Sequence, residues 1–251
     1  MDPDMKVEPR EWLAEGLLMK GKINCMFGPE KSGKSRALGW ILLHCIVGKP
    51  LWDGIPVKSP GKILYLLGEE SQGDIVDRMR IYTELAETKF EDISWAENMT
   101  FIDAAGMRLD LPTQREWLSN QIQEGQYDTV VIDPMRRVHG ASESSNDDMS
   151  RIFNDFRAWI TQYDLTLIMI HHTGKLGEYE DEDRIATWSR GATDLPAVLD
   201  WATYLRRNQS GGGRADRVTI KRAGRAPGLD PLKVWDHGDQ KPGWSIEPSP
   251  K

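Results

Sequence analysis

Short apolar runs alternate with longer amphipathic stretches over most of the chain, and this alternation predicts the fold. Buried strands are predicted where aliphatic residues run together, at 22–27, 63–67, 98–103, 129–132 and 165–170. Helices are predicted where apolar residues recur three or four positions apart, at 33–47, 74–86, 113–123 and 149–163. Strands that alternate with helices favour a mostly parallel central sheet covered by helices on both faces.

The last part of the chain follows a different pattern. A long charged loop over 173–190 is predicted to lead into a short helix near 191–199. Strands are then expected at 200–206, 216–222 and 232–236, with Gly-rich and Pro-rich turns between them, which favours antiparallel pairing. The predicted fold class is therefore α/β, with a mostly parallel central sheet flanked by helices and with antiparallel C-terminal strands.

The length of 251 residues suits one large α/β domain. We expect residues 1–251 to form this single domain, with a short polar lead-in at 1–16 and a C-terminal tail at 237–251. Within the lead-in, Trp12 and Leu13 are expected to pack back on the core.

Several features predict a cytoplasmic protein. Cys25 and Cys45 lie inside apolar runs, which is typical of reduced thiols in a core. No apolar run is long enough to span a membrane, and the acidic N-terminus is unlike a signal peptide. We therefore expect no membrane partner.

The formal net charge of −7 gives no basic footprint for nucleic acid over the chain as a whole. Binding to a DNA strand would have to use a local basic patch, such as the mouth or pore of an oligomer.

The segment GPEKSGKS at 28–35 matches G-x-x-x-x-G-K-[ST] in full, between a predicted strand and a predicted helix. The backbone N–H groups of such a loop and the helix N-terminus together form an anion site. Lys34 is expected to reach the β- and γ-phosphates, and Ser35 to bind Mg²⁺. The predicted cofactors are therefore ATP and Mg²⁺. The predicted nucleotide-binding residues at this loop are Gly28, Pro29, Glu30, Lys31, Ser32, Gly33, Lys34, Ser35 and Arg36.

Acidic residues at two other strand ends complete the expected chemistry. Asp133 ends an apolar strand, as expected of a carboxylate that orients Mg²⁺ with Ser35. Pro134 follows it, so a carboxylate that activates water must come from elsewhere. Glu69 and Glu70 are the candidates, at the end of a strand expected beside the phosphate-loop strand. The alternative is that both are solvated charges at a strand end.

His171 and His172 end another core strand, and adjacent strand residues point to opposite sides of a sheet. A polar side chain there could detect the γ-phosphate, or it could pack or cap the strand. We favour the sensor role for His172 and the structural role for His171.

A basic cluster of Lys221, Arg222 and Arg225 is expected in a loop after a late strand. It is either a solvated turn or an arginine finger supplied to a neighbouring subunit.

Taken together, these motifs resemble the RecA-like superfamily, and within it the RepA-type hexameric helicases and their phage or plasmid relatives. The resemblance rests on GPEKSGKS (28–35), LYLLGEES (64–71), VVIDPMRRVHG (130–140), IMIHHTGK (168–175) and SRGATDL (189–195). It implies that Glu69 is the catalytic base, with Glu70 a possible partner, and that His172 is the γ-phosphate sensor. It also implies that Lys221 with Arg222 or Arg225 reaches the nucleotide of a neighbouring subunit.

The resemblance further implies a ring-shaped homo-oligomer, a hexamer, that binds single-stranded DNA through pore loops at 135–148 and 173–190. These loops contain the basic residues Arg136, Arg137, Lys175, Arg184 and Arg190. The acidic run at 178–183 in the second loop would repel a phosphate backbone if it lined the pore.

The expected function is an ATP-hydrolysing replicative helicase. One alternative is a recombination or strand-annealing ATPase that uses ATP as an affinity switch without unwinding. A P-loop kinase acting on a small molecule is a more distant alternative.

Overall fold

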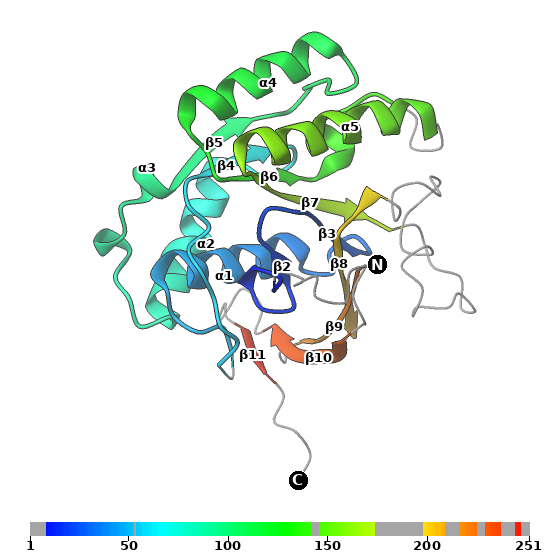
Figure 1. The fold of residues 1–251 in the computed structure, drawn as a ribbon. Helices are drawn as coiled ribbons and strands as arrows, with labels where there is room; N and C mark the ends of the chain where they lie inside the picture. The colour runs from blue at the N-terminus through cyan, green and yellow to red at the C-terminus, as the bar shows by residue number, and fades with distance from the viewer. Residues whose placement is uncertain are drawn as a thin grey trace, which may run out of the picture.

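The computed structural model describes residues 9–52, 54–141, 146–173, 198–208, 216–224, 229–236 and 244–246. In these ranges, a nine-stranded sheet runs through the molecule in the order β11-β10-β9-β8-β3-β7-β6-β4-β5 (Figure 1). Its strands are β3 (Ile23–Gly28), β4 (Ile63–Leu67), β5 (Met99–Asp103), β6 (Thr129–Asp133), β7 (Thr166–His172), β8 (Trp201–Asn208), β9 (Asp216–Gly224), β10 (Leu229–Asp236) and β11 (Trp244–Ile246). The strands from β8 to β5 in this order pair in parallel, and β8 to β11 pair antiparallel. This confirms the predicted fold class.

One detail of the predicted strand order is wrong. The strand that ends before Glu69 was expected beside the phosphate-loop strand, but β3 lies between β7 and β8. Strand β4 pairs with β5 and β6 instead. An apolar run shows that a strand is buried on both faces, but it does not identify the neighbouring strand.

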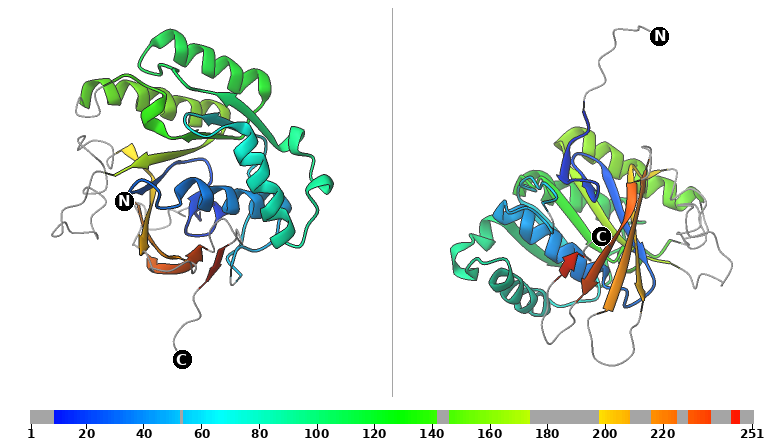
Figure 2. Two further views of the ribbon diagram at one scale, coloured as in Figure 1. Left: turned by 180° about the vertical axis from the view of Figure 1, so that it is seen from behind. Right: turned by 90° about the horizontal axis from the view of Figure 1, so that it is seen from below.

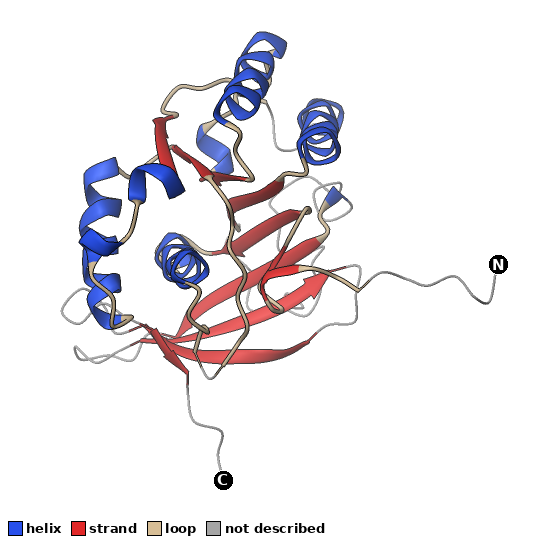
Figure 3. Ribbon diagram, turned by 60° about the vertical axis from the view of Figure 1, so that its left-hand side comes forward, coloured by secondary structure: helices blue, strands red, loops and turns tan. Residues whose placement is uncertain are grey.

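Helices cover both faces of the parallel part of the sheet (Figure 3). On one face lie α1 (Lys34–Val47) and α2 (Gln72–Leu85), and on the other lie α4 (Pro112–Gly125) and α5 (Asn146–Tyr163). The side chains of Ile63, Tyr65 and Leu67 belong to the core under α1 and α2, whereas Leu64 and Leu66 belong to the core under α4 and α5. This alternation explains why β4 is apolar throughout.

The helix ends follow local capping chemistry. Helix α1 ends at Gly48, which has a left-handed backbone with φ of 68°, as the glycine after its apolar pattern predicted. Helix α2 begins two residues before the predicted start, because the Ser71 hydroxyl and the Asp74 carboxylate form a reciprocal capping box. Helix α5 also begins earlier than predicted, so the expected loop at 135–148 is shorter. That loop begins with the short 3-10 helix η2 (Met135–Arg137).

Two short helical segments, η1 (Phe90–Asp92) and α3 (Trp95–Asn98), lie between α2 and β5 and were not predicted. The short helix predicted near 191–199 lies mostly outside the described residues. None of the described helices combines the length and the apolar character needed to cross a membrane.

The C-terminal strands extend the sheet alongside α1 (Figures 1 and 2). Leu205 of β8, Ile220 of β9, Val234 of β10 and Trp244 of β11 join the same buried core as the apolar side chains of α1. Strand β11 lies inside the segment 237–251 that was expected to be a tail, and it pairs with β10. The start of α1, where the phosphate loop ends, therefore has C-terminal strands beside it.

Near the N-terminus, β1 (Trp12–Ala14) and β2 (Leu18–Met19) form a small antiparallel pair that was not predicted. Leu13 is buried, as expected, and the ring of Trp12 contacts the edge of Trp201 at 4.8 Å between centroids. Asn24 of β3 ties this pair to the sheet. Its amide oxygen accepts from the Met19 N–H at 2.7 Å, and its amide nitrogen donates to the Met19 carbonyl at 2.9 Å.

We predict that Asn24→Ala destabilises the fold without changing the residues of the cleft. The substitution leaves buried backbone groups of Met19 without their partner, which costs about 1–3 kcal/mol of the free energy of unfolding. Chemical denaturation measures this loss. The matched control is Asn98→Ala, because the Asn98 amide donates to Ser94 in an exposed position, and its effect should stay within about 0.5 kcal/mol. Equal effects of the two substitutions would contradict the role assigned to Asn24.

Candidate functional site

The carboxyl ends of β3, β4, β6, β7 and β8 meet at one edge of the sheet, because these strands run parallel. A cleft of about 420 Å³ lies at this edge. The residues that line it are Lys31, Gly33, Lys34, Ser35, Arg36, Glu69, Glu70, Arg78, Asp133, His172 and Arg207. All of these except Arg78 and Arg207 were candidates from the sequence. Glu69 and Glu70 reach the cleft although β4 is not next to β3, because all the parallel strands end at the same edge of the sheet.

The phosphate loop between β3 and α1 has the backbone that its glycines allow. Gly33 precedes α1 with φ of 89°, in the left-handed region that favours glycine. A Cβ added to Gly28 would lie 2.5 Å from the carbonyl oxygen of Leu205 on β8, so a larger residue would force these strands apart. Gly28 is therefore required by the close approach of the loop to β8, and Gly33 by its left-handed backbone.

The Lys34 ammonium is directed onto the same loop. Its Nζ donates to the Gly28 carbonyl at 2.9 Å, to the Pro29 carbonyl at 2.7 Å and to the Ser32 hydroxyl at 3.4 Å. The side chain is buried, and this burial lowers the pKa of Lys34 to about 8, although the Asp133 carboxylate acts in the opposite direction. The loop's own oxygens hold the cation at the place where a phosphate would bind.

A hydroxyl and a carboxylate lie together beside the loop. The Ser35 hydroxyl donates to Asp133 Oδ1 at 3.1 Å, and the Tyr65 hydroxyl donates to Asp133 Oδ2 at 2.7 Å. Burial raises the pKa of Asp133 to about 6, while the two hydroxyl hydrogen bonds lower it. Tyr65 was not a candidate, because in the sequence it is one more apolar residue of a buried strand.

The Ser35 and Asp133 oxygens fit a magnesium site. Mg²⁺ prefers oxygen ligands and usually takes one or two of them from protein, with the rest from nucleotide phosphates and water. Among the described residues there is no group of three or more His, Cys, Asp and Glu side chains that could hold a metal by themselves. The pair is therefore suited to an ion that arrives with a nucleotide.

The two glutamates after β4 have different partners. Glu70 accepts from both terminal nitrogens of Arg78 on α2, at 3.0 and 2.5 Å. Glu69 accepts from Arg137 Nε at 2.8 Å with one oxygen, and its other oxygen lies 3.8 Å from His172 Nε2. Glu69 is thus oriented towards the end of β7, whereas Glu70 is held against α2.

The two histidines point to opposite faces, as predicted from their adjacency. His171 is 3% exposed, and its ring packs near that of Phe27 on β3, at 5.6 Å between centroids. His172 lines the cleft. Its pKa is lowered, first by burial and then by the Lys34 charge, so the imidazole is held in its neutral form near pH 7.

Arg137, which was expected to contact DNA from a pore loop, has a partner beside the cleft. Its Nε donates to Glu69 Oε1 at 2.8 Å. Its neighbour Arg136 is exposed and does not line the cleft. The rest of the two predicted pore loops is only partly described, since 142–145 and 174–190 lie outside the described residues.

Two of the three members of the late basic cluster lie on a strand and not in the loop expected for the cluster. Lys221 and Arg222 pair with β8 within β9, which covers the predicted strand 216–222 and continues to Gly224. The Arg222 guanidinium donates to the backbone carbonyl of Asp230 on β10. Neither residue lines the cleft of its own chain, and Arg225 lies outside the described residues.

A family model for an AAA domain matches residues 3–178, which is well over half of the chain. The chain belongs to this AAA-domain family. The matched region contains the phosphate loop, both glutamates, Asp133 and His172, and with the geometry above it makes the chain a P-loop ATPase of the AAA/RecA-like superfamily. Such ATPases bind a nucleotide, typically with Mg²⁺. A comparison with curated proteins gives no match.

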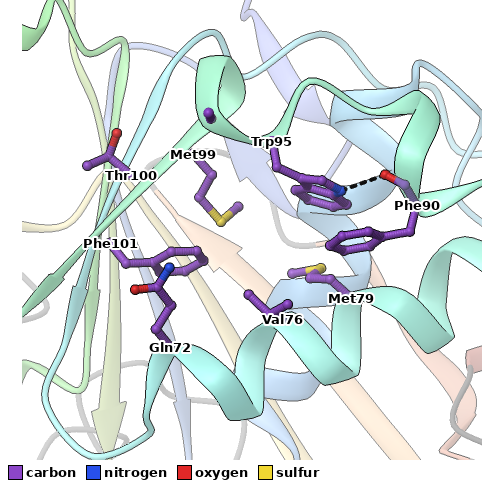
Figure 4. A pocket seen from close by; sticks show the side chains of 9 residues that line it. Gln72, Val76, Met79, Phe90, Trp95, Met99, Thr100 and Phe101 are labelled. Atoms are coloured by element: carbon purple, nitrogen blue, oxygen red, sulfur yellow. Dashed lines mark hydrogen bonds between the residues drawn. The ribbon is translucent and has the colours of Figure 1, made fainter.

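A second pocket of the AAA domain, about 400 Å³ in volume, lies between α2, α3 and the edge strand β5 (Figure 4). Its wall is mainly apolar: Phe90 stacks on Trp95, and Met79, Met99 and Phe101 lie around them. No charged residue lines it. It offers neither a phosphate site nor a general base, so the chemistry of this ATPase belongs to the first cleft.

We predict that Glu69→Gln retains nucleotide binding but lowers ATP turnover about a hundredfold or more, because an amide cannot accept a proton from water. Glu70→Gln should be milder, since Glu70 is held by Arg78. Nucleotide affinity and steady-state hydrolysis measure both effects, with Lys34→Ala as the control that loses affinity and turnover together. If Glu70→Gln proves the more severe, the base is Glu70.

Proposed function

We propose that this AAA-domain ATPase is a ring-forming motor that acts on single-stranded DNA, with the role of a RepA-type replicative helicase. The observation that carries the proposal is the contact between Glu69 and Arg137. It links the carboxylate best placed to activate water directly to the segment after β6, which the family resemblance places at a central pore.

In the proposed reaction, the residues of the cleft have separate roles in binding the nucleotide and hydrolysing it. Lys34 and the backbone N–H groups of its loop bind the β- and γ-phosphates, and Ser35 and Asp133 hold the metal. Mg²⁺, when bound, neutralises the charge that develops on the transferring phosphate. Glu69 orients the attacking water and takes its proton.

His172 is suited to report the state of the γ-phosphate. Its neutral ring lies at the end of β7, 3.8 Å from Glu69, and the chain continues from there into the second predicted pore loop. A change in its hydrogen bonding on hydrolysis would alter the start of that loop. The two segments proposed to face DNA, 135–148 and 173–190, would then each begin just after a residue of the nucleotide cleft, Asp133 and His172 respectively.

Arg137 holds Glu69 in a pair that a DNA strand can compete for. The two side chains are 60% and 41% exposed, so the pair contributes little free energy and is easily exchanged. A phosphate of the strand that binds Arg137 would free Glu69 to act on water. In this mechanism DNA stimulates hydrolysis by releasing the base.

We predict that Arg136→Ala and Arg137→Ala have different effects on hydrolysis. Arg136→Ala should reduce the stimulation by single-stranded DNA and leave basal turnover nearly unchanged, because Arg136 does not line the cleft. Arg137→Ala should raise basal turnover, by up to about fivefold for the loss of one exposed ion pair, and should also reduce stimulation.

Both rates are measured as ATP hydrolysis over a range of salt, in samples whose oligomeric state is determined at the same time. The salt slope of DNA binding should be shallow, on the order of a few phosphate contacts, given the net charge of −7. A confirmed oligomer that ignores single-stranded DNA at low salt would contradict the helicase proposal. DNA-dependent hydrolysis without movement along the strand would instead favour the recombination or annealing ATPase.

A ring also predicts that subunits share active sites. Lys221 and Arg222 do not line the cleft of their own chain, and the family resemblance implies that they reach a neighbour's nucleotide. Mixing Arg222→Ala subunits with Glu69→Gln subunits should restore part of the ATPase activity, since some mixed interfaces combine an intact arginine with an intact base. The same mixture made with Arg225→Ala tests the other arginine. If neither mixture regains ATPase activity although the subunits are shown to co-assemble, the basic cluster has a structural role.

A further inference from the structure

One buried carboxylate binds two guanidinium groups at the edge of the nucleotide cleft. The side chain of Asp236, at the end of β10, is 0% exposed. Its Oδ1 lies 2.8 Å from Arg36 Nη2 on α1, and its Oδ2 accepts a hydrogen bond from Arg207 Nη2 on β8. Both arginines also line the cleft, where their side chains are 18% and 21% exposed.

This cluster lies against the phosphate loop itself. A Cβ added to Gly33 would be 3.3 Å from Arg207 Nη2, 3.3 Å from the Trp244 ring and 3.5 Å from Asp236 Oδ2. The glycine therefore leaves room for a guanidinium beside the first turn of α1. Of the three residues that such a Cβ would approach, only Arg207 lines the cleft.

The cluster and the hydrolytic residues occupy opposite sides of β3. Asp133 and His172 end β6 and β7, and Glu69 follows β4; these three strands all lie on the β7 side of β3. Arg207 lies near the end of β8, on the other side of β3. If the γ-phosphate of a bound nucleotide lies near Glu69, the phosphates that ATP and ADP share would therefore lie near Arg207.

The charges favour an anionic ligand at this place. Two guanidinium groups face one carboxylate beside the loop. A guanidinium presents its N–H donors in a rigid fork that matches phosphate oxygens. The buried carboxylate fixes the orientation of that fork, and burial without these partners would be costly for Asp236.

We propose that Arg207 binds the phosphate chain of the nucleotide within its own subunit, and that Asp236 is a positioning residue that orients Arg207 and Arg36 for this contact. The inference rests on the nucleotide site proposed above. It assigns to the C-terminal strands, outside the matched AAA region, a part in nucleotide affinity that is separate from the chemical step.

The first test is Arg207→Gln, with the binding of ADP and ATP measured by calorimetry and hydrolysis measured at saturating ATP. Loss of a charge-assisted contact should weaken both nucleotides by about ten- to hundredfold, while kcat changes by less than about threefold. The control is Arg206→Gln, the preceding residue of β8, which is exposed and does not line the cleft. It should bind both nucleotides as the wild type does.

The second test separates positioning from simple stability. Asp236→Asn should weaken ADP binding in the wild-type background but have little further effect in the Arg207→Gln background, because it acts through Arg207. Thermal unfolding of each variant shows whether it is folded. Should Asp236→Asn not fold, Arg207→Lys takes its place: it keeps the charge but loses the fork, and ADP binding should still weaken several-fold.

Each outcome decides the question. Normal ADP and ATP binding by Arg207→Gln would overturn this inference alone. Weakened ATP binding with normal ADP binding would place Arg207 at the γ-phosphate and overturn the position assigned to it. A wild-type protein that binds neither nucleotide would remove the proposed nucleotide site, and this inference with it.

Discussion

The parallel pairing of β3 with both β7 and β8 is the constraint on which the rest of the structure depends. It fixes the phosphate loop in the middle of the sheet, between a strand that ends at His172 and a strand that carries Arg207. The close approach that this pairing imposes explains Gly28, since a side chain there would collide with the backbone of Leu205. Because every parallel strand delivers its carboxyl end to the same edge, residues far apart in the sequence meet around one loop.

Among the described residues, each acidic side chain that lines the cleft already has a partner in the protein, and so has Asp236 beside it. Glu69 is bound by Arg137, Glu70 by Arg78, Asp133 by two hydroxyls, and Asp236 by two arginines. Lys34 is similarly held by the oxygens of its own loop. Binding of a nucleotide with its metal would therefore exchange existing contacts for new ones, and the surrounding elements would respond to that exchange.

The sequence contains the information for the fold and for much of the candidate site. The phosphate loop was recognisable because all its ligands are contiguous, and the strands because burial on both faces makes them continuously apolar. Glu69, Asp133 and His172 were recognisable because each follows directly on such a run. Their catalytic roles stay predictions.

Four residues at or beside the cleft were not identified from the sequence, because they matter through contacts with residues that only the fold brings close. They are Tyr65, Arg78, Arg207 and Asp236. Tyr65 meets Asp133 across 68 positions, and Arg207 meets Asp236 across 29. The same limit applies to strand order. Nothing in the run at 63–67 distinguishes pairing with β6 from pairing with β3. The contact between Arg137 and Glu69 could likewise not be predicted, because the two residues are far apart in the sequence.

The contact between Glu69 and Arg137 also bears on how a distant ligand could control hydrolysis. Coupling between two sites requires an element with two alternative arrangements, each favoured by one ligand. A carboxylate oxygen that accepts a hydrogen bond from Arg137 is less available to a water molecule than a free one. The two uses of Glu69 thus compete, and a ligand that engages Arg137 favours one of them. Since Arg137 lies in η2, directly after the strand that carries Asp133, the coupling needs no long path through the protein. In the proposed function, this route would let an acidic protein respond to a nucleic acid through very few contacts.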